Sequence, residues 1–379
     1  MSVCECDIFK ICGGCPCRGQ ELSEYQKQKF TKVAHILDVL PQPIPWSAPI
    51  FIADGNRRRA SLAFVWQKNK LYFGFNQKSS KQIIEVKYCQ SLTPMLNKVI
   101  EPLRVLLSQL CCIPVKSKKG RKEFLQNIQS GDVWLCETIT GVDVVLECNT
   151  PLTLEHRMII FETINSIPEI IRFSHRCRNT DFPEPIIEKS KPYIKINDKQ
   201  VYIPAGTFLQ PSQQGQEALI DIVKKYLDNT EGKIFDLFCG VGTFSYMLSS
   251  NNKNQIVAVD FSKELLQGFQ ESINSNQISN IEILSRNLFK YPMDIKELKG
   301  ANVVVFDPPR AGAAAQVKML SAISAADRPQ KIIAVSCHPA TFVNDAKVLL
   351  AAGYKLKDIT LVDQFIYSNH SELVALFTT

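Results

Sequence analysis

Two side chains in the last quarter of the chain, Asp307 and Cys337, are of types that carry reactions, and each stands at the end of a short apolar segment. Asp307 ends VVVFD at 303–307, and Cys337 directly follows IIAVS at 332–336. Such segments are typical of buried strands, and open α/β sheets keep reactive groups at the carboxyl ends of their strands. A thiol at a strand exit is therefore a candidate nucleophile. The alternative, an inert packing thiol, is expected inside a strand rather than after it.

A glycine loop, FDLFCGVGTF at 235–244, precedes both residues. Gly240 and Gly242 permit a tight strand-to-helix turn and a close approach of a cofactor to the backbone. Asp260 ends the next predicted strand, where a carboxylate would accept hydrogen bonds from ribose hydroxyls. The G-x-G pattern by itself also fits dinucleotide enzymes. The G-x-G pattern together with the Cys337 thiol indicates methyl transfer to a poorly nucleophilic pyrimidine carbon. Such a carbon reacts only after a nucleophile has bonded covalently to the acceptor.

Two further groups complete this chemistry. The prolines after Asp307 stiffen the strand exit, so its carboxylate is placed to hydrogen-bond a planar base. Glu372, in HSE, begins an otherwise apolar segment and is a candidate general base, although alone it would be read as a solvated loop carboxylate. His338 adjoins Cys337 but is not assigned as its base, because consecutive side chains point apart. A helix N-terminus and nearby cations are expected to lower the pKa of Cys337.

The elements that position these groups follow from the apolar pattern after residue 206, where predicted strands and helices alternate. The expected fold is a doubly wound α/β sheet with its ligand at the carboxyl ends of the strands. We expect two domains, 1–205 and 206–379, with part of 20–45 packed on the second. The predicted strands are 234–238, 256–260, 281–285, 303–307 and 332–336, followed by a terminal strand pair.

The first half reads as antiparallel strands with interspersed helices, and it carries the excess positive charge. Residues 1–205 hold 28 Lys and Arg against 20 Asp and Glu, whereas residues 206–379 hold 16 against 17. This asymmetry fits a front half that binds a polyanion, although a slightly basic surface explains it equally well. Basic residues of the kind that contact phosphates gather at Arg57–Arg59, Lys116–Lys122, Arg172, Arg176 and Arg178. RNA contact is favoured for Arg57–Arg59, whereas a solvated loop explains Lys116–Lys122 at least as well.

Five of the thirteen cysteines lie within CECDIFKICGGCPC at 4–17. Cys6, Cys12 and Cys15 place three thiols on a short loop, which its two central glycines allow to fold tightly. Such clusters hold zinc or an iron–sulfur centre, and spacing alone leaves the choice open. Cys89 is the best remote fourth ligand; Cys4 and Cys17 are the local competitors. The x3-x2 cysteine spacing expected of radical S-adenosylmethionine enzymes is absent from this segment.

Composition excludes several classes of protein. Hydrophobic residues make up 45% of the 379 residues and charged residues 21%, as in ordinary globular proteins. No apolar run approaches the ~20 residues that span a bilayer. The N-terminus lacks the basic and apolar regions of a signal peptide, so a cytoplasmic protein without a membrane partner is expected.

Taken together, these motifs resemble the RNA 5-methyluridine (uracil-C5) methyltransferase family over nearly the whole chain. The matching segments are the cysteine cluster, FLQPS at 208–212, DLFCGVGTF, DPPRAG, SCHPAT and HSE. His338 stands where the family has Asn, Ile366 where it has Pro, and Thr243 where Asn is common. The cluster begins at residue 6, so the chain most resembles the short 23S rRNA enzymes without an N-terminal β-barrel.

The resemblance implies a class I S-adenosylmethionine-dependent methyltransferase fold preceded by an iron–sulfur-bearing α+β RNA-binding domain. It also implies a [4Fe–4S] cluster on Cys6, Cys12, Cys15 and Cys89. The nucleophile would be Cys337, the base Glu372, and Asp307 would orient the uracil. The enzyme is expected to be a monomer. The residues expected near S-adenosylmethionine are Gln210, Phe238, Gly240, Gly242, Thr243, Asp260, Asn287 and Asp307.

Three alternatives stay open at this point. The chain could methylate uracil C5 in tRNA, although family members that act on tRNA generally lack the cluster. It could methylate cytosine C5 in RNA, which uses the same thiol chemistry but without a terminal H-x-E. It could also be an iron–sulfur RNA-binding protein without enzyme activity, which the intact Cys337, Asp307 and Glu372 argue against.

Overall fold

The computed structural model describes residues 6–119, 122–177 and 182–379, with side chains left out at 116–125. It separates into two compact units. Residues 20–52 and 195–202, which the predicted boundary at 205/206 put in the first half, belong to the second unit. The first unit comprises Met1–Gly19, Ala53–Ile194 and Ile203–Ser212, and the second comprises Gln20–Ile52, Lys195–Tyr202 and Gln213–Thr379.

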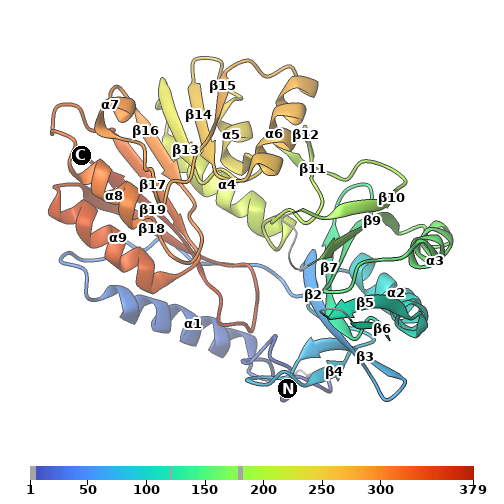
Figure 1. Cartoon of the computed structure of the whole chain (residues 1–379). Coiled ribbons are helices and arrows are strands. Elements are labelled where there is room, and N and C mark those ends of the chain that lie inside the picture. Colours follow the sequence, from blue (N-terminus) through green and yellow to red (C-terminus); the bar gives the residue numbers. More distant parts are fainter. Residues whose placement is uncertain (1–5, 120–121, 178–181) are drawn as a thin grey trace. The chain divides into compact units, whose positions relative to one another are not determined.

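The second unit is built on an eight-stranded sheet with the order β1-β18-β19-β17-β16-β13-β14-β15 (Figure 1). Strands β13 to β17 are parallel, and β19 runs antiparallel to both β17 and β18. The predicted strands and the terminal strand pair are therefore present. The strands are β1 (Ile50–Phe51), β13 (Lys233–Leu237), β14 (Gln255–Asp260), β15 (Ile281–Ser285), β16 (Val303–Phe306), β17 (Lys331–Ser336), β18 (Lys355–Asp363) and β19 (Glu372–Thr378).

Helices cover both faces of this sheet, as expected for a doubly wound fold (Figure 1). The central strands are buried on both sides, which explains their continuous apolar sequence. One face packs under α1, α8 and α9, whose Leu37, Leu320 and Phe342 join a shared core. The helices are α1 (Leu22–Leu37), α4 (Gln213–Leu227), α5 (Thr243–Leu248), α6 (Lys263–Ser275), α7 (Ile295–Leu298), α8 (Ala314–Ser321) and α9 (Pro339–Ala351). A small hairpin of β11 (Tyr193–Ile196) and β12 (Lys199–Tyr202) meets α6.

The first unit is a seven-stranded sheet with the order β10-β9-β8-β7-β2-β3-β4. Its strands pair antiparallel except β8 and β9, which are parallel because α3 connects them. Sequence periodicity did not reveal this parallel pair. The strands are β2 (Arg59–Gln67), β3 (Lys70–Asn76), β4 (Ile83–Glu85), β7 (Ser130–Glu137), β8 (Val142–Cys148), β9 (Ile170–Cys177) and β10 (Glu184–Glu188), with a separate hairpin of β5 (Val115–Lys119) and β6 (Lys122–Gln126).

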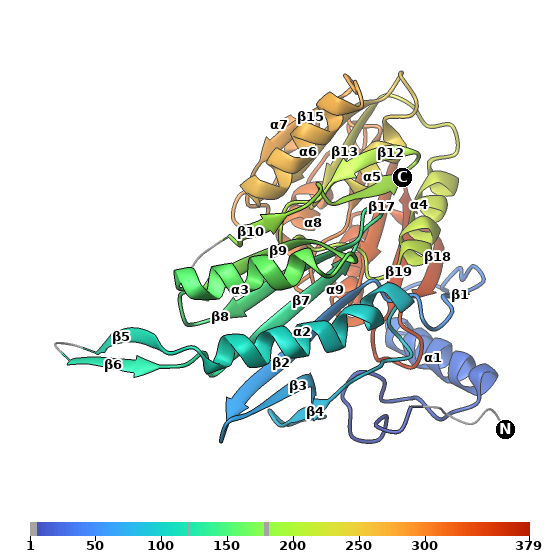
Figure 2. The same ribbon diagram turned by 90° about the vertical axis from the view of Figure 1, so that its right-hand side faces the viewer.

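Two helices, α2 (Pro94–Cys112) and α3 (Leu154–Asn165), lie across the same sheet (Figure 2). Helix α2 begins at Pro94 after its N-cap Thr93, whose hydroxyl accepts a hydrogen bond from the Leu96 amide, and it continues through Pro102. Its apolar side chains recur every three or four residues, from Leu96 to Leu110, and all are buried against the sheet. In the part of the chain that the structure describes, none of the helices is both long and apolar enough to cross a membrane.

Candidate active site

The second unit brings three predicted catalytic groups to one edge of its sheet. Strand β17 ends at Ser336, which pairs with Leu373 of β19, so Cys337 and Glu372 lie opposite each other where the two strands meet. Strand β16 runs parallel to β17, pairs Phe306 with Ala334, and leads directly into Asp307. The groups come from three separate stretches of chain. Strand pairing alone is what places them together.

Burial sets the acidity of these groups in the free enzyme. It raises the pKa of Cys337 to about 11, with further increases from the charges of Glu372 and Asp307. Burial likewise raises the pKa of Asp307 to about 7 and that of Glu372 well above its ordinary range. The predicted lowering of the Cys337 pKa is therefore wrong for the ligand-free protein. Low-dielectric surroundings and two carboxylates outweigh the helix N-terminus, so the resting site holds a neutral thiol.

Arg310 is a site residue that the sequence reasoning did not single out, although it closes the DPPR motif. Its NH2 group lies 2.7 Å from Nδ1 of His370. The Arg310 charge lowers the pKa of Cys337 and that of Glu372, against the effect of burial. An arginine only donates, so Nδ1 of His370 is the acceptor in this contact. Arg310 thus places a positive charge near both the Cys337 thiol and the Glu372 carboxyl.

The replacement of the usual Asn by His338 has a local explanation. His338 is the N-cap of α9, and its Nδ1 accepts a hydrogen bond from the Thr341 amide at 3.4 Å. An imidazole nitrogen here takes the acceptor role that an Asn side-chain oxygen fills at many helix starts. This contact engages Nδ1 with the start of the helix, and the expectation that His338 is not the base for Cys337 stays a prediction.

The glycine loop after β13 leaves room above the backbone. Phe238, Gly240 and Gly242 all have positive φ, at 60°, 56° and 87°. A Cβ on Gly242 would stand 2.5 Å from the Phe269 ring, so this glycine is required for packing. A Cβ on Gly240 would meet nothing within 4 Å. That open space at a parallel-strand end is where a class I methyltransferase fold would hold its cofactor.

Asp260 and Asn287 build the surroundings of this loop. The Asp260 carboxylate accepts hydrogen bonds from the Gly240 amide at 2.9 Å and the Phe261 amide at 2.6 Å. The Asn287 side-chain oxygen accepts from the amides of Phe289 and Lys290, at 3.1 and 3.2 Å. Both side chains therefore order their own loops, and their contacts to a cofactor stay predictions. Thr243 begins α5 beside them, whereas Gln210 belongs to the first unit, where its carbonyl accepts from Arg58.

Asp236 is a second residue that sequence reasoning missed. It is fully buried in β13, one carboxylate oxygen accepts from Ser245 Oγ at 2.6 Å, and within the described residues the other has no hydrogen-bond partner. Its pKa is raised to about 7, chiefly by burial and then by the charges of Asp307 and Asp260. Its position in the motif FDLFCG was the available signal. A buried oxygen without a partner, under the open loop, fits a cofactor with donors of its own.

This carboxyl gives a testable pH dependence of stability. Because its pKa is raised on folding, Asp236 contributes stability that is complete below its ordinary pKa and is lost as pH rises toward 7. Between pH 5 and pH 8 the ligand-free protein should lose about 2–3 kcal/mol of unfolding free energy through this group. Asp236→Asn should remove that part of the dependence of the unfolding free energy on pH.

The measurement is urea unfolding at both pH values, followed through Trp46, the one tryptophan in the sequence of the second unit. A background with Trp66→Phe and Trp134→Phe isolates its fluorescence. Asp221→Asn, at a surface position of α4, serves as the control and should keep the parent slope. Equal slopes for Asp236→Asn and the parent would contradict the prediction.

The predicted cysteine ligands all lie in the first unit. Cys12 stands close enough to Cys6 and Cys15 for their charges to raise its pKa, after the larger effect of burial. Cys89 is related in the same way to Cys15. Among the residues described, no three His, Cys, Asp or Glu side chains surround a point as ligands of a single metal ion do. Cys17 is half-buried, and Cys4 lies outside the described residues.

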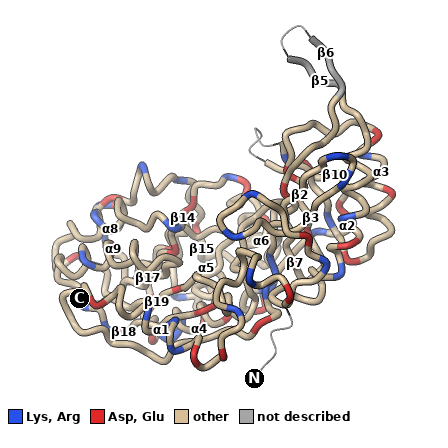
Figure 3. Tube along the Cα trace, turned by 90° about the horizontal axis from the view of Figure 1, so that it is seen from below, with Lys and Arg blue, Asp and Glu red and all other residues tan. Residues whose placement is uncertain are grey.

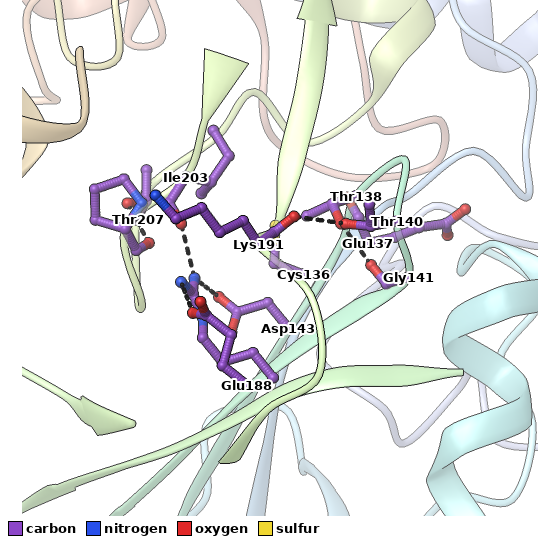
Figure 4. A network of polar contacts seen from close by, with 12 residues as sticks. Cys136, Glu137, Thr138, Thr140, Gly141, Asp143, Glu188, Lys191, Ile203 and Thr207 are labelled. Atoms are coloured by element: carbon purple, nitrogen blue, oxygen red, sulfur yellow. Dashed lines mark hydrogen bonds and ion pairs between the residues drawn. The ribbon is translucent and has the colours of Figure 1, made fainter. Parts of the chain in front are cut away.

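The arginines expected to contact phosphates have mostly structural partners. Arg172 is buried, donates to both Asp143 carboxylate oxygens at 2.8 and 2.9 Å, and reaches Glu188, so its predicted RNA contact is wrong (Figure 4). Arg176 is paired with Glu147. Figure 3 shows Asp and Glu interspersed with Lys and Arg along the first unit, so much of its positive charge is locally balanced. Residues 120–121 of the basic run, and Arg178, lie outside the described residues.

Of the three consecutive arginines, Arg58 and Arg59 hold the segment that carries the FLQPS motif. Arg58 is buried and donates from Nε to the Gln210 carbonyl at 2.9 Å, so it is not available to phosphate. Arg59 donates to the Leu209 carbonyl at 2.7 Å, and its guanidinium lies 4.1 Å from the centre of the exposed Phe208 ring. These bonds fix the backbone that presents Phe208.

The second unit has the mixed α/β sheet and strand-end site of an S-adenosylmethionine-dependent methyltransferase. A profile of the tRNA (uracil-5-)-methyltransferase family matches residues 186–379. An uncharacterized RNA methyltransferase of Agrobacterium fabrum is 30% identical, over 97% of this chain and 82% of the relative. The chain belongs to this family, and the predicted class of enzyme, an RNA uracil-C5 methyltransferase that uses S-adenosylmethionine, is confirmed.

Two further proteins show similarity along nearly the whole chain. The 23S rRNA (uracil(1939)-C(5))-methyltransferase RlmD of Aliivibrio fischeri is 28% identical over 98% of this chain and 81% of that protein. The crystal structure of Pyrococcus abyssi tRNA (uracil-54, C5)-methyltransferase, solved with S-adenosyl-L-homocysteine, superimposes with a TM-score of 0.72 at 22% identity. It covers 97% of this chain and 86% of that one, so the two share a fold.

Proposed function

We propose that this enzyme methylates C5 of a uridine in 23S rRNA through a covalent bond between Cys337 and C6 of the uracil. The placement of Cys337 opposite Glu372 across β17 and β19, with Asp307 on the adjacent strand, is the observation that carries the proposal. Cys337 can add to C6, Glu372 can remove a proton from C5, and Asp307 can orient the ring. Their convergence is hard to explain for transfer to nitrogen or oxygen, which needs no thiol.

The residues that would hold the cofactor surround the glycine loop. Gly240 leaves the backbone open, and the free carboxylate oxygen of Asp236 and the carboxylate of Asp260 offer acceptors nearby. When bound, S-adenosylmethionine supplies a methyl group on a positively charged sulfur and leaves as the neutral thioether. The charges of Asp307 and Asp260 both raise the pKa of Asp236, so this end of the sheet suits a cation.

The reaction proceeds through the chain's own groups in four steps. The uridine must first leave its stack, because the reacting carbons are inaccessible in stacked RNA. Cys337 then releases its proton to solvent and its sulfur bonds to C6, which moves the C5–C6 electron pair into an enolate. C5 next bonds to the methyl group. Glu372 finally removes the C5 proton, the double bond re-forms, and Cys337 departs as a thiolate.

The electrostatics suit this order. Burial, and then the charges of Glu372 and Asp307, raise the pKa of Cys337, so attack depends on Arg310 to offset those negative charges. Once the Cys337 thiolate has become a thioether, the sulfur no longer places a negative charge beside Glu372. A carboxyl whose pKa is raised by burial is a strong enough base to take the C5 proton.

Ribosomal RNA is the favoured substrate because relatives matching 98% of this chain are named 23S rRNA enzymes. The family description instead names tRNA, which makes tRNA the second candidate. The test is incubation of the enzyme and S-adenosylmethionine with unmodified 23S rRNA and, separately, with unmodified tRNA. We expect 5-methyluridine in the rRNA digest by mass spectrometry. Methylated tRNA with unmodified rRNA would reverse the choice. We further propose that the enzyme acts as a cytoplasmic monomer.

We also propose a [4Fe–4S] cluster on Cys6, Cys12, Cys15 and Cys89. The cluster is larger than one ion, so its ligand sulfurs stand farther apart than around a single metal, and the observed neighbour relations suit it. The Gly14 amide donates to the Cys12 sulfur at 3.5 Å. The positive charge of Arg57 faces Cys12, Cys15 and Cys89, which suits an anionic cluster.

Anaerobic purification tests the cluster. The native protein should contain about four irons and matching acid-labile sulfide per chain. Cys12→Ser should lose both together with the visible absorption, whereas the control Cys17→Ser should keep them. Zinc at one per chain in the native protein, without iron or sulfide, would contradict the proposal. So would an unchanged iron content in Cys12→Ser.

A further inference from the structure

Helix α1 of the second unit carries two buried polar side chains on successive turns, Tyr25 and Lys29. Tyr25 is 2% exposed and Lys29 is 7% exposed. Lysine is rarely buried unless its charge is paired, because removing an ammonium group from water is unfavourable. Nothing in the proposed reaction uses either residue, and α1 lies far from the catalytic groups in the sequence. The buried polar groups of Tyr25 and Lys29 therefore require hydrogen-bonding or charged partners.

That partner is the segment joining β18 to β19. The Tyr25 hydroxyl donates to Asp363 Oδ2 at 2.6 Å. Lys29 Nζ lies 3.6 Å from Asp363 Oδ1, donates to the Ser368 carbonyl at 2.8 Å and also donates to the His370 carbonyl. The Tyr25 and Tyr367 rings are 5.0 Å apart. One lysine thus links the fully buried Asp363, the last residue of β18, to two carbonyls near the end of the segment that follows it.

The segment carries the groups that act on C5. His370 contacts Arg310, and Glu372 follows two residues later as the first residue of β19. Its own order comes from short-range bonds, such as Phe365 N to Asp363 Oδ1 at 3.3 Å, and Tyr367 has a φ of 65°. A loop in this conformation depends on partners outside itself. Helix α1 supplies them, and Figures 1 and 2 show it beside the β18–β19 connection.

We propose that Lys29, assisted by Tyr25, is a positioning residue that holds the β18–β19 connection so that Glu372 and the Arg310–His370 pair face the C5 proton. The inference rests on the covalent reaction proposed above. Lys29 touches no reacting atom and acts through the backbone carbonyls it binds. Its loss should therefore slow proton removal more than attack by Cys337, whose own strand and helix are separate from this segment.

The test variant is Lys29→Met with Asp363→Asn, which removes the ammonium and the carboxylate charge together, so that no buried charge is left alone. The control is Lys32→Met, on the exposed side of the same helix. We expect kcat to fall by about tenfold to a hundredfold, as for displaced catalytic groups, with KM for RNA within threefold. We also expect a covalent RNA–protein band on a denaturing gel. Lys32→Met should match the parent enzyme.

Tyr25→Phe provides a milder second variant, because it keeps the ring contact with Tyr367 and removes only the hydroxyl. It should show the same pattern with a smaller loss of kcat. Binding of S-adenosylmethionine, measured by calorimetry, checks that each variant is folded. If the Lys29→Met/Asp363→Asn variant does not fold, the result for Tyr25→Phe tests the inference. Parental turnover in a folded variant overturns the inference, and so does slow turnover without the covalent band. Normal methylation by Cys337→Ser would instead overturn the proposed reaction itself.

Discussion

Replacement of Cys337 by serine should abolish 5-methyluridine formation, with a loss of at least about a thousandfold in kcat. C5 of uracil is a poor nucleophile until a sulfur bonds to C6, and a serine hydroxyl at this position has no assigned base to activate it. The pKa of Cys337 is already raised to about 11 by burial and two carboxyl groups, and a hydroxyl would be far harder to ionise. Radioactive methyl transfer to rRNA measures the loss.

The matched control is Cys112→Ser, because Cys112 is an exposed free thiol outside the site. It should retain full activity. Binding of S-adenosylmethionine to Cys337→Ser should stay within about threefold of the parent, since the residue lies at another strand end from the glycine loop. Normal methylation by folded Cys337→Ser would contradict the covalent mechanism.

Replacement of Glu372 by glutamine should stop the reaction one step later. An amide cannot accept the C5 proton, so Cys337 cannot be eliminated and the methylated RNA stays bonded to the protein. Product release should fall by about a hundredfold or more, within the range of lost general-base catalysis. The adduct should run as a slow band on a denaturing gel and should carry the radioactive methyl group.

Two comparisons make this result specific. The double variant Cys337→Ser/Glu372→Gln should give no slow band, because no sulfur is available to bond to C6. Glu282→Gln, at an exposed position in β15, should behave as the parent enzyme. A Glu372→Gln enzyme that turns over without accumulating an adduct would assign proton removal to another group.

The apolar pattern and motifs were sufficient to predict the catalytic fold and to propose its reactive residues. Continuous apolar runs predict buried parallel strands, and the residues that follow them, Asp307 and Cys337, are found at one edge of the sheet because parallel strands end on the same side. The cysteine spacing likewise predicted that Cys6, Cys12 and Cys15 would be neighbours. These are local signals, each contained in a short stretch of chain.

Contacts between segments that are distant in the sequence could not be predicted from these local patterns. Periodicity does not show that Arg172 would meet Asp143 and be buried, or that β8 and β9 would pair in parallel. The same holds for the raised pKa of Cys337, since burial depends on everything packed around a group. The role of His338 became clear only from its contact with the Thr341 amide.

By itself, the sequence predicted which residues should carry the chemistry, because reactive types at strand exits and next to a glycine loop are local patterns. Only the tertiary structure decided how those residues are held and how acidic they are. Lys29 and Asp363 are separated by most of the chain, yet the ammonium group of one meets the carboxylate of the other in the core. Such pairs arise when helices and sheets pack, and the physical reason is that hydrogen-bond partners and loss of water are set by neighbours in space.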